Sequence, residues 1–328
     1  MSITQAKVAI ITVTFNSSGF ITNYLNALSC YLTDSSFRLI IVDNASTDDT
    51  VDRIKQFTQT VKLPETCVQI IKLKKNIGFG RGCNEGVRSA AKSDALYYWF
   101  LNPDTEALAD SAIKLLDTFQ QHKEADFVGS VLTDEQQQIR AGAFRFPTIT
   151  NICLSTLRLR ILDSLFTQHT TAIPIEKKPY RADWLTGASF MAKKSAITKL
   201  EAFDPHYFLY FEEVDLFYRA KKSGLSAWCA PDSKVFHISG ASTGINQKKQ
   251  SHLRPKRQPK YWFESRRYFY LKNYGRLYFI LLDFLQVTCL LVWKLRTKLQ
   301  KKHDDTAKCL LRDIIKHSYL ATIITKKK

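Results

Sequence analysis

The first 130 residues alternate short apolar runs, rich in β-branched residues, with segments whose apolar positions recur at helical spacing. The runs that we predict to be strands are Val8–Thr14, Leu39–Asp43, Val68–Leu73 and Ala95–Leu101. They are almost continuously apolar, as expected of strands covered on both faces. Strands that alternate with helices are typical of a parallel sheet with crossover helices. The pattern therefore predicts an α/β fold for this part of the chain.

Two of the predicted strands end abruptly in polar residues. Asp43 ends the second run, and Asn102-Pro103-Asp104 follows the fourth. Ligands of open α/β sheets bind at the carboxyl ends of the strands, so both positions are candidates for binding. Each also has a simpler explanation, because Asp43 would cap a following helix equally well and an Asn-Pro-Asp sequence is common in turns.

The pattern is less regular after Asp134. Residues 146–181 show no clear period and are predicted to be an insertion, whereas Ser226–His237 resembles a further pair of strands. Its final residue, His237, is either a ligand that completes a metal site or a structural histidine.

Three carboxylates, Glu212, Glu213 and Asp215, follow an apolar and aromatic run. Crowding beside apolar surface raises the pKa of a carboxyl group and suits it to proton abstraction. An acidic first turn of a helix gives the same pattern, so both interpretations stay open.

Residues 277–293 form the most apolar segment of the chain. It is 17 residues long and contains Asp283 and Gln286, whereas a membrane-spanning helix needs about 20 apolar residues and tolerates a central carboxylate poorly. We expect a helix that either packs on the body of the protein or lies in the membrane interface, with the neighbouring Arg and Lys residues contacting phosphates.

The net charge of +18 is concentrated in the C-terminal part. Residues 246–328 contain 21 Lys and Arg against 5 Asp and Glu, a net of +16, which leaves +2 for residues 1–245. A basic segment with aromatic residues suits nucleic acid or an anionic membrane, and charge alone does not separate the two.

Other features exclude some classes of protein. The seven cysteines have no metal-ligand spacing and are expected to be reduced, and the N-terminus lacks the pattern of an export signal, which predicts a cytoplasmic location. Gly78, Gly80 and Gly82 resemble a dinucleotide fingerprint, but Cys83 occupies the place of its third glycine, which argues against a classical NAD-binding fold.

Seven stretches, taken in order, resemble the family 2 glycosyltransferases, in particular their bacterial rhamnosyltransferase-like branch. They are residues 11–16 (ITVTFN), 41–46 (IVDNAS), 76–84 (NIGFGRGCN), 101–105 (LNPDT), 183–188 (DWLTGA), 208–216 (FLYFEEVDL) and 237–243 (HISGAST). The resemblance implies a GT-A fold with a mixed, mainly parallel sheet over residues 1–245. Its nucleotide-sugar half would be about 1–130 and its acceptor half about 131–245, followed by a basic helical region at 246–328.

The resemblance also implies roles for individual residues. Those expected at the nucleotide-sugar site are Thr14, Asn16, Asp43, Asn76, Gly78, Arg81 and Asn102. Asn102-Pro103-Asp104 stands where the family carries its metal-binding DxD, so Asp104, with His237, would hold Mg²⁺ or Mn²⁺. Trp184 and Glu212 would border the acceptor. Glu213 matches the residue that is usually the catalytic base, and because the family has Asp there, Asp215 stays an alternative.

These roles imply an inverting transfer from a nucleoside diphosphate sugar to a saccharide or polyprenyl-linked acceptor in lipopolysaccharide or capsule synthesis. The similar branch commonly uses dTDP-rhamnose. The basic C-terminal region then favours a peripheral location on the inner face of the cell membrane, with no nucleic acid expected. The alternatives are a catalytically inactive glycan-binding or scaffold protein, and a protein that binds nucleic acid through residues 248–272, where aromatic side chains are able to stack on bases.

Overall fold

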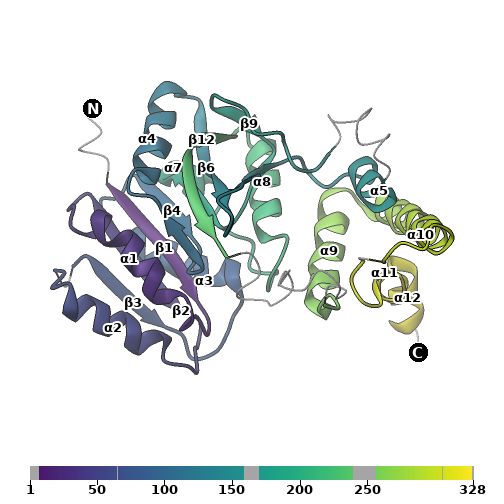
Figure 1. Ribbon diagram of the computed structural model, residues 1–328, viewed down its shortest axis with the longest axis horizontal. Coiled ribbons are helices and arrows are strands. Elements are labelled where there is room, and N and C mark those ends of the chain that lie inside the picture. Colours follow the sequence, from purple (N-terminus) through teal and green to yellow (C-terminus); the bar gives the residue numbers. More distant parts are fainter. Residues whose placement is uncertain (1–6, 65, 159–169, 239–255, 305, 327–328) are drawn as a thin grey trace. The chain divides into compact units, whose positions relative to one another are not determined.

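The computed structural model describes residues 7–64, 66–158, 170–238, 256–304 and 306–326. The chain divides into two compact units (Figure 1). Unit 1 comprises residues 1–144, 174–208 and 212–242, and unit 2 comprises residues 145–173, 209–211 and 243–328. The boundary predicted after residue 245 lies outside the described residues, as do residues 239–243 of the last matching stretch. Residues 145–173, which we expected in the acceptor half, group instead with the C-terminal helices.

Unit 1 is built on a mixed, mainly parallel sheet. Its strands are β1 (Val8–Thr14), β2 (Phe37–Asp43), β3 (Val68–Lys72), β4 (Tyr97–Leu101), β5 (Thr105–Ala107), β6 (Ala125–Thr133), β7 (Ile139–Arg140), β9 (Tyr180–Ala182), β11 (Ser189–Lys193) and β12 (Ser226–His237). Their order is β3-β2-β1-β4-β11-β6-β12-β5, with β7 paired to β6 and β9 paired to β12. Strands β3, β2, β1 and β4 are parallel to one another, and β11 is antiparallel to both β4 and β6. A separate two-stranded sheet joins β8 (Ala143–Phe144) to β10 (Trp184–Leu185).

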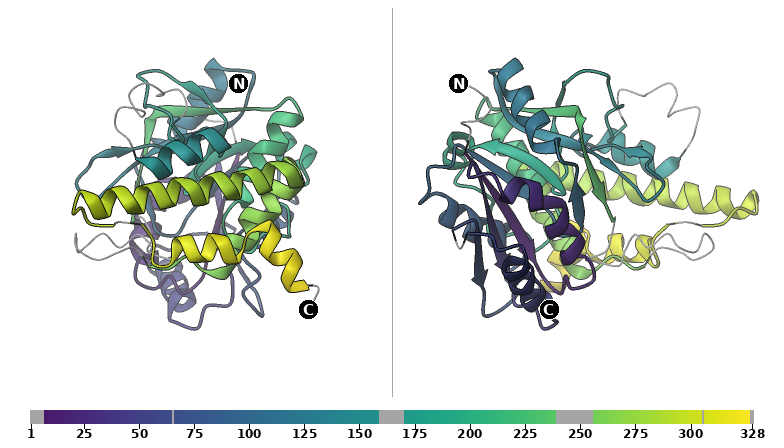
Figure 2. Two further views of the ribbon diagram at one scale, coloured as in Figure 1. Left: turned by 90° about the vertical axis from the view of Figure 1, so that its right-hand side faces the viewer. Right: turned by 60° about the vertical axis from the view of Figure 1, so that its left-hand side comes forward.

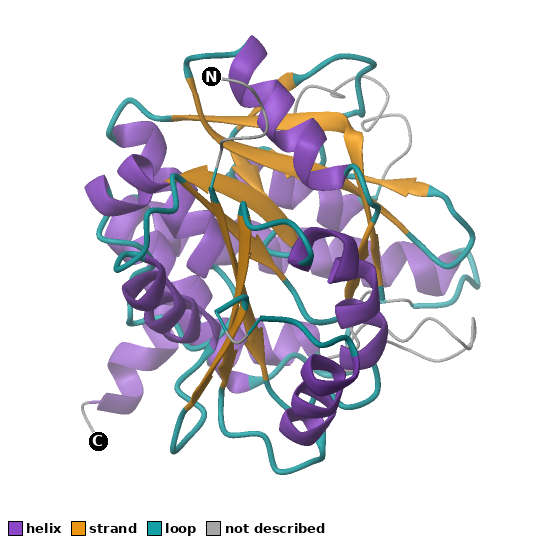
Figure 3. Cartoon of the chain, turned by 90° about the vertical axis from the view of Figure 1, so that its left-hand side faces the viewer, coloured by secondary structure: helices purple, strands orange, loops and turns teal. Residues whose placement is uncertain are grey.

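Helices lie on the faces of the sheet (Figure 3). They are α1 (Ile21–Leu32), α2 (Thr50–Thr60), α3 (Phe79–Ala90), α4 (Ser111–Gln121), α7 (Lys194–Lys199) and α8 (Glu212–Lys222). Alternate β1 side chains explain the double cover: Ile10 is in the core cluster that α1, α2 and α4 form with the sheet, whereas Ile11 and Val13 meet α3. All seven β1 residues are buried, which explains why the strand is almost continuously apolar in the sequence.

The four strands predicted in the first 130 residues are confirmed, with shifts of two residues or fewer at their ends. Ser226–His237 is one strand and not the expected pair. Its ladder to β6 is interrupted between Ala230 and Lys234, around Pro231, and then resumes along the same partner. Because proline lacks an N–H to donate, the interruption made one irregular strand look like two.

Unit 2 consists of helices, and its longest element is α10 (Arg276–Leu299) (Figure 2). The others are α5 (Ile149–Leu157), α9 (Lys260–Asn273), α11 (Leu310–Lys316) and α12 (Tyr319–Lys326), all of which contact α10. Helix α10 extends beyond the predicted 277–293 because Lys and Arg residues continue it for more than a turn. It is the one helix in the described part of the chain whose length and mean hydropathy match those of a membrane-spanning segment.

Glycines allow α3 to pack closely on β1. A Cβ at Gly86 would lie 2.4 Å from Cγ2 of Ile11, and a Cβ at Gly82 would lie 2.8 Å from Cγ1 of Val13. Since the sheet side chains are buried, they have little room to move away. The approach of α3 therefore requires the absence of side chains at these two positions.

We predict that Gly86→Ala lowers the free energy of unfolding by about 1–2 kcal/mol. Overpacking costs roughly 1–3 kcal/mol, and the better helix propensity of alanine offsets up to about 1 kcal/mol of this cost. Urea unfolding measures the difference. The matched control is Gly19→Ala, since a Cβ at Gly19 meets nothing within 4 Å. Equal stability of the two variants would contradict this account of the packing.

Candidate functional site

The carboxyl ends of the parallel strands bring the first predicted site residues together. Thr14 and Asp43 are partners in the β1–β2 register, and β4 ends at Leu101 beside β1. Asp43 is 3% exposed, and its two carboxylate oxygens accept hydrogen bonds from Thr14 Oγ1 at 3.1 Å and from the Ser46 backbone N–H at 3.2 Å. The carboxylate is thus held in one orientation at the edge of the sheet where ligands bind.

Asn16 organises the loop that follows β2. Its backbone has a φ of 50°, its N–H donates to Ser46 Oγ at 3.0 Å, and its side-chain oxygen accepts the Thr47 N–H at 2.8 Å. Since Ser46 also bonds to Asp43, Asn16 and Asp43 are parts of one hydrogen-bonded loop structure.

Asn44 was not among the predicted site residues, although it lies within the matching stretch 41–46. It is buried, and its Nδ2 donates to Asn76 Oδ1 at 2.9 Å and to the Gly78 carbonyl at 3.2 Å, while its Oδ1 accepts the Ile77 N–H at 2.9 Å. Asn76 in turn accepts the Gly78 N–H. The signal in the sequence was a polar residue directly after a buried strand, and its role is to fix residues 76–78 against the end of β2.

Gly78 permits a close approach between two segments far apart in the chain. It has a φ of 93°, and a Cβ there would lie 2.3 Å from the Phe208 carbonyl oxygen, which also accepts the Phe79 N–H at 2.9 Å. The start of α3 is thereby joined to the segment that leads to α8.

Arg81 points its guanidinium to the carbonyl oxygen of Pro205, to which Nε donates. One turn further along α3, Asn84 makes two hydrogen bonds with the backbone of Phe203. Arg81 thus has a structural role, because it helps to join α3 to residues 203–205. This role is an alternative to the predicted contact with the nucleotide.

Asp104 and His237, the two predicted metal ligands, are neighbours. Pairing of β5 with β12 sets Thr105 opposite His237, and Nε2 of His237 lies 3.5 Å from Oδ1 of Asp104. Asp104 is 4% exposed. Three buried atoms here have no hydrogen-bond partner, namely Oδ1 of Asn102, Oδ1 of Asp104 and Nδ1 of His237. Buried polar atoms without partners are costly, so each suits a ligand.

This donor set fits a hard divalent cation. No group of three or more His, Cys, Asp or Glu side chains arranged around a common point occurs among the described residues. Mg²⁺ nevertheless binds commonly through one or two carboxylates together with water and substrate phosphates. Asp104 and His237 therefore suffice only for an ion that a phosphate ligand helps to hold.

Glu212 and Glu213 begin helix α8 and have raised pKa values. Burial raises the pKa of Glu213 to about 6. Burial and the neighbouring Glu213 carboxylate raise that of Glu212 well above its usual range. One carboxylate oxygen of each residue, Oε2, is buried without a hydrogen-bond partner. Glu212 packs against α3, with its Cβ 3.4 Å from the place of a Cβ at Gly80.

Residues 187 and 188 lie between Glu213 and the end of β4. Its Oε1 is 3.8 Å from the place of a Cβ at Gly187, which also lies 3.7 Å from the Phe79 ring. The next residue, Ala188, accepts the Asn102 N–H at 3.0 Å. Glu213 and Phe79 thus both lie beside Gly187, and the residue after Gly187 is hydrogen-bonded to Asn102.

Asp215, the alternative base, is fully buried, and both its oxygens are bonded. Tyr207 donates to Oδ1 at 3.2 Å, and Arg219 Nε donates to Oδ2 at 2.8 Å. Arg219 also donates to the Leu200 and Ala202 carbonyls. This arrangement is that of a structural ion pair.

Trp184 lies on β10, where its ring stacks on Phe144 with centroids 4.4 Å apart. The preceding residue, Asp183, accepts a 2.7 Å hydrogen bond from Lys221 of α8. The 183–188 stretch, which contains Gly187, is thus anchored on the helix that carries Glu213.

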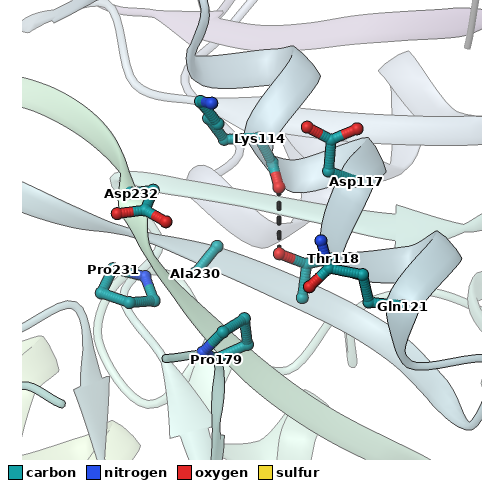
Figure 4. A pocket seen from close by; sticks show the side chains of 8 residues that line it. All are labelled: Lys114, Asp117, Thr118, Gln121, Pro179, Ala230, Pro231 and Asp232. Carbon is teal, nitrogen blue, oxygen red and sulfur yellow. Dashed lines mark hydrogen bonds between the residues drawn. The ribbon is translucent and has the colours of Figure 1, made fainter. Parts of the chain in front are cut away.

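A polar hollow of about 100 Å³ lies elsewhere in unit 1 and contains none of the predicted residues (Figure 4). Its lining comprises Lys114, Asp117, Thr118 and Gln121 of α4 together with Pro179, Ala230, Pro231 and Asp232. The hydrogen bond in Figure 4, from Thr118 Oγ1 to the Lys114 carbonyl, is internal to the helix.

We predict that Asp215→Asn lowers the free energy of unfolding by about 3 kcal/mol, because it removes a fully buried carboxylate and leaves the partly buried Arg219 without its counter-charge. Asp49→Asn is the matched control, since Asp49 pairs with Arg53 at the same helical spacing on the surface. The control should change stability by less than about 1 kcal/mol. Urea unfolding compares the two, and a stable Asp215→Asn protein without activity would instead favour a catalytic role.

Comparisons with known proteins complete the description. The model of a family described as glycosyl transferase family 2 matches residues 9–184. An N-acetylglucosaminyl-diphospho-decaprenol L-rhamnosyltransferase of Mycobacterium tuberculosis is 25% identical over 272 residues, which cover 79% of this chain and 84% of that protein. Rhamnosyltransferase WbbL of Escherichia coli is 25% identical over 169 residues, which cover 49% of this chain and 61% of that protein. The solved structure of S. aureus TarS 1-349 in complex with UDP-GlcNAc has a similar fold, with a TM-score of 0.51, 14% identity, and coverage of 89% of this chain and 72% of that one.

Proposed function

Because the chain belongs to glycosyl transferase family 2, we propose that it is an inverting enzyme that moves a sugar from a nucleoside diphosphate sugar to a lipid-linked saccharide. The GT-A fold predicted from the sequence is confirmed. The observation that carries the proposal is the connection of Glu213 to the Asn102–Asp104 segment through Gly187 and Ala188. It supports the proposal because a carboxylate with a raised pKa lies beside the segment that is hydrogen-bonded to Asn102, two residues before the Asp104 that pairs with His237.

The donor is assigned to the edge formed by β1, β2 and β4. Asp43, held by Thr14 and Ser46, would accept hydrogen bonds from the nucleobase. Asn44 would act indirectly, by fixing residues 76–78 at the same edge. Relatives named as rhamnosyltransferases make dTDP-rhamnose the first donor to test.

Asp104 and His237 would hold Mg²⁺ or Mn²⁺, and Asn102 contributes a further unpaired oxygen beside them. Such an ion, when bound, offsets the negative charge that develops on the leaving diphosphate. A site with two protein ligands depends on that diphosphate, so metal and nucleotide should bind cooperatively.

In the transfer, Glu213 would accept the proton of the acceptor hydroxyl while the oxygen of that hydroxyl attacks the anomeric carbon. The bond from that carbon to the diphosphate breaks, and its electron pair leaves with the nucleoside diphosphate. Of the three carboxylates in the first turn of α8, Asp215 is occupied by Arg219 and Glu212 packs on α3, which leaves Glu213 as the base. A single displacement of this kind inverts the configuration of the sugar.

The acceptor is assigned to the side of Trp184 and Glu212. An acceptor such as the one in the name of the mycobacterial relative carries its saccharide on a polyprenyl chain. We therefore extend the proposal to an enzyme of surface polysaccharide synthesis that works at the inner face of the cell membrane.

We predict that kcat increases with pH through about 6, because Glu213 accepts a proton only when ionised and the pKa of its side chain is raised to about 6. Glu213→Gln should lower kcat by roughly 10²–10⁴-fold and remove this pH dependence, while leaving nucleotide-sugar binding intact. Initial rates between pH 5 and 8 measure both effects.

The control for this prediction is Glu201→Gln, at an exposed position outside the site, which should keep the wild-type profile. Full activity of Glu213→Gln would exclude Glu213 as the base. An inactive Glu213→Gln that also fails to bind the nucleotide sugar would point to a binding role.

We predict that a nucleoside diphosphate sugar raises the melting temperature only when Mn²⁺ or Mg²⁺ is present. Asp104→Ala and His237→Ala should each abolish this metal-dependent shift, because either change leaves a single protein ligand. Thermal shift against a panel of nucleoside diphosphate sugars, beginning with dTDP-rhamnose, provides the measurement.

Asp117→Ala is the control for the metal experiment, since Asp117 lines the polar hollow of Figure 4 and is not a candidate site residue. A wild-type shift that is identical with EDTA would rule out the metal assignment and leave the glycosyltransferase assignment standing. The absence of any shift across the panel would count against the donor class itself.

A further inference from the structure

We infer that the outer face of α10 is a docking surface for an anionic lipid bilayer, on which the helix lies along the surface instead of crossing it. This inference goes beyond the proposed function, since α10 belongs to unit 2 and carries none of the candidate site residues. It assigns one defined helix face to a lipid ligand.

The outer face is a continuous apolar stripe. Its exposed large side chains are Leu277, Leu281, Phe284, Leu291, Val292, Leu295 and Leu299, with Leu277 84% and Phe284 66% exposed. With the exposed Thr288, they follow one another at intervals of three or four residues, apart from the adjacent pair at 291 and 292, and so share one side of the helix. The stripe extends over about 33 Å at 1.5 Å per residue. An uncovered apolar surface of this length is typical of a binding surface.

The inner face of α10 carries the polar residues. Asp283 is 5% exposed and accepts a 2.7 Å hydrogen bond from Arg266 of α9, and Gln286 accepts another from the same guanidinium. The Tyr319 N–H of α12 donates to the second Asp283 oxygen. The charge of Asp283 is therefore neutralised by Arg266 inside unit 2. Asp283 does not contribute charge to the outer face.

Basic residues stand at both ends of the stripe. Arg276 is exposed beside Leu277, and Lys298, Lys301 and Lys302 are exposed beside Leu299. Between them, Lys294 is paired with Asp304 and Arg296 bonds to the Arg158 carbonyl. An apolar face with cationic ends matches the acyl boundary and phosphate groups of an anionic bilayer, which identifies lipid as the partner in preference to a second protein surface.

The packing of unit 2 favours an interfacial helix over a spanning one. Helix α10 contacts α5, α9, α11 and α12, of which α9 and α11 carry exposed charges such as Lys260 and Lys316. A spanning α10 would have to take these charges into the hydrocarbon or lose its partners and expose Asp283. Lying along the surface avoids both costs.

Sedimentation of the full-length protein with vesicles tests the inference. Wild type should bind vesicles of phosphatidylcholine with phosphatidylglycerol, and the triple variant Leu281→Gln/Phe284→Gln/Leu291→Gln should bind them about tenfold more weakly or worse. Lys298→Gln/Lys302→Gln should weaken binding to these vesicles but not the residual binding to pure phosphatidylcholine. The control is Leu96→Gln/Leu108→Gln/Ile139→Gln, which removes exposed apolar side chains from unit 1 and should bind as wild type does.

The readouts separate this inference from the proposed function. Urea unfolding verifies that each variant is folded, and it depends on neither lipid nor a bound nucleotide. Wild-type vesicle binding by the α10 triple variant would overturn the docking surface. Resistance of bound protein to alkaline carbonate would overturn the interfacial arrangement in favour of a span. A lipid-free dimer that the triple variant dissociates, without vesicle binding, would assign the face to a second copy.

Discussion

The geometry of the candidate site depends on the two different ladders of strand β4. Its parallel pairing with β1 brings Leu101 to the same edge of the sheet as Thr14 and Asp43. Its antiparallel pairing with β11 sets Ser189 opposite Leu101, so that Gly187 and Ala188 reach this edge from the opposite direction. A slip of one residue in either ladder would reverse the side on which every side chain lies. The ends of β1, β2 and β4 and the segment that leads into β11 are thus held at one edge by backbone hydrogen bonds.

Local sequence was sufficient for much of unit 1, because β1, β2 and β4 are almost wholly buried and a polar residue ends each strand or directly follows it. These features define the three strands and the edge at which Asp43 and Asp104 lie. The division of the chain was not predictable in the same way. Residues 209–211 group with unit 2 while Phe208 and Glu212 group with unit 1, and no composition change marks such a short excursion. Contacts between distant segments decide the grouping, and the local pattern does not contain them.

The three carboxylates of α8 illustrate which features a local sequence pattern does not predict. They are alike in type and lie within four residues, yet Asp215 is bonded to Arg219 and Tyr207 while Glu212 and Glu213 retain unpaired oxygens. The Asp215–Arg219 spacing of i and i+4 was visible in the sequence and favours an ion pair. The difference in surroundings between Glu212 and Glu213 was not visible in the sequence, because it depends on Gly80 and Gly187, which come from other elements. Asn44 escaped prediction for the same reason, since its partners at 76–78 become neighbours only when the sheet forms.

Helix α10 shows why a charge count along the sequence is a weak guide to how a helix meets its surroundings. Asp283 and Gln286 lower the apolar character of the segment when it is read linearly. In three dimensions both face Arg266, a buried cation that needs counter-charge and would otherwise carry a large desolvation cost. The polar residues therefore hold unit 2 together, and they do so from the side of α10 that the stripe does not use. Because one face satisfies the polar groups internally, the opposite face is free to be apolar along its length apart from Thr288, as binding to a lipid surface requires.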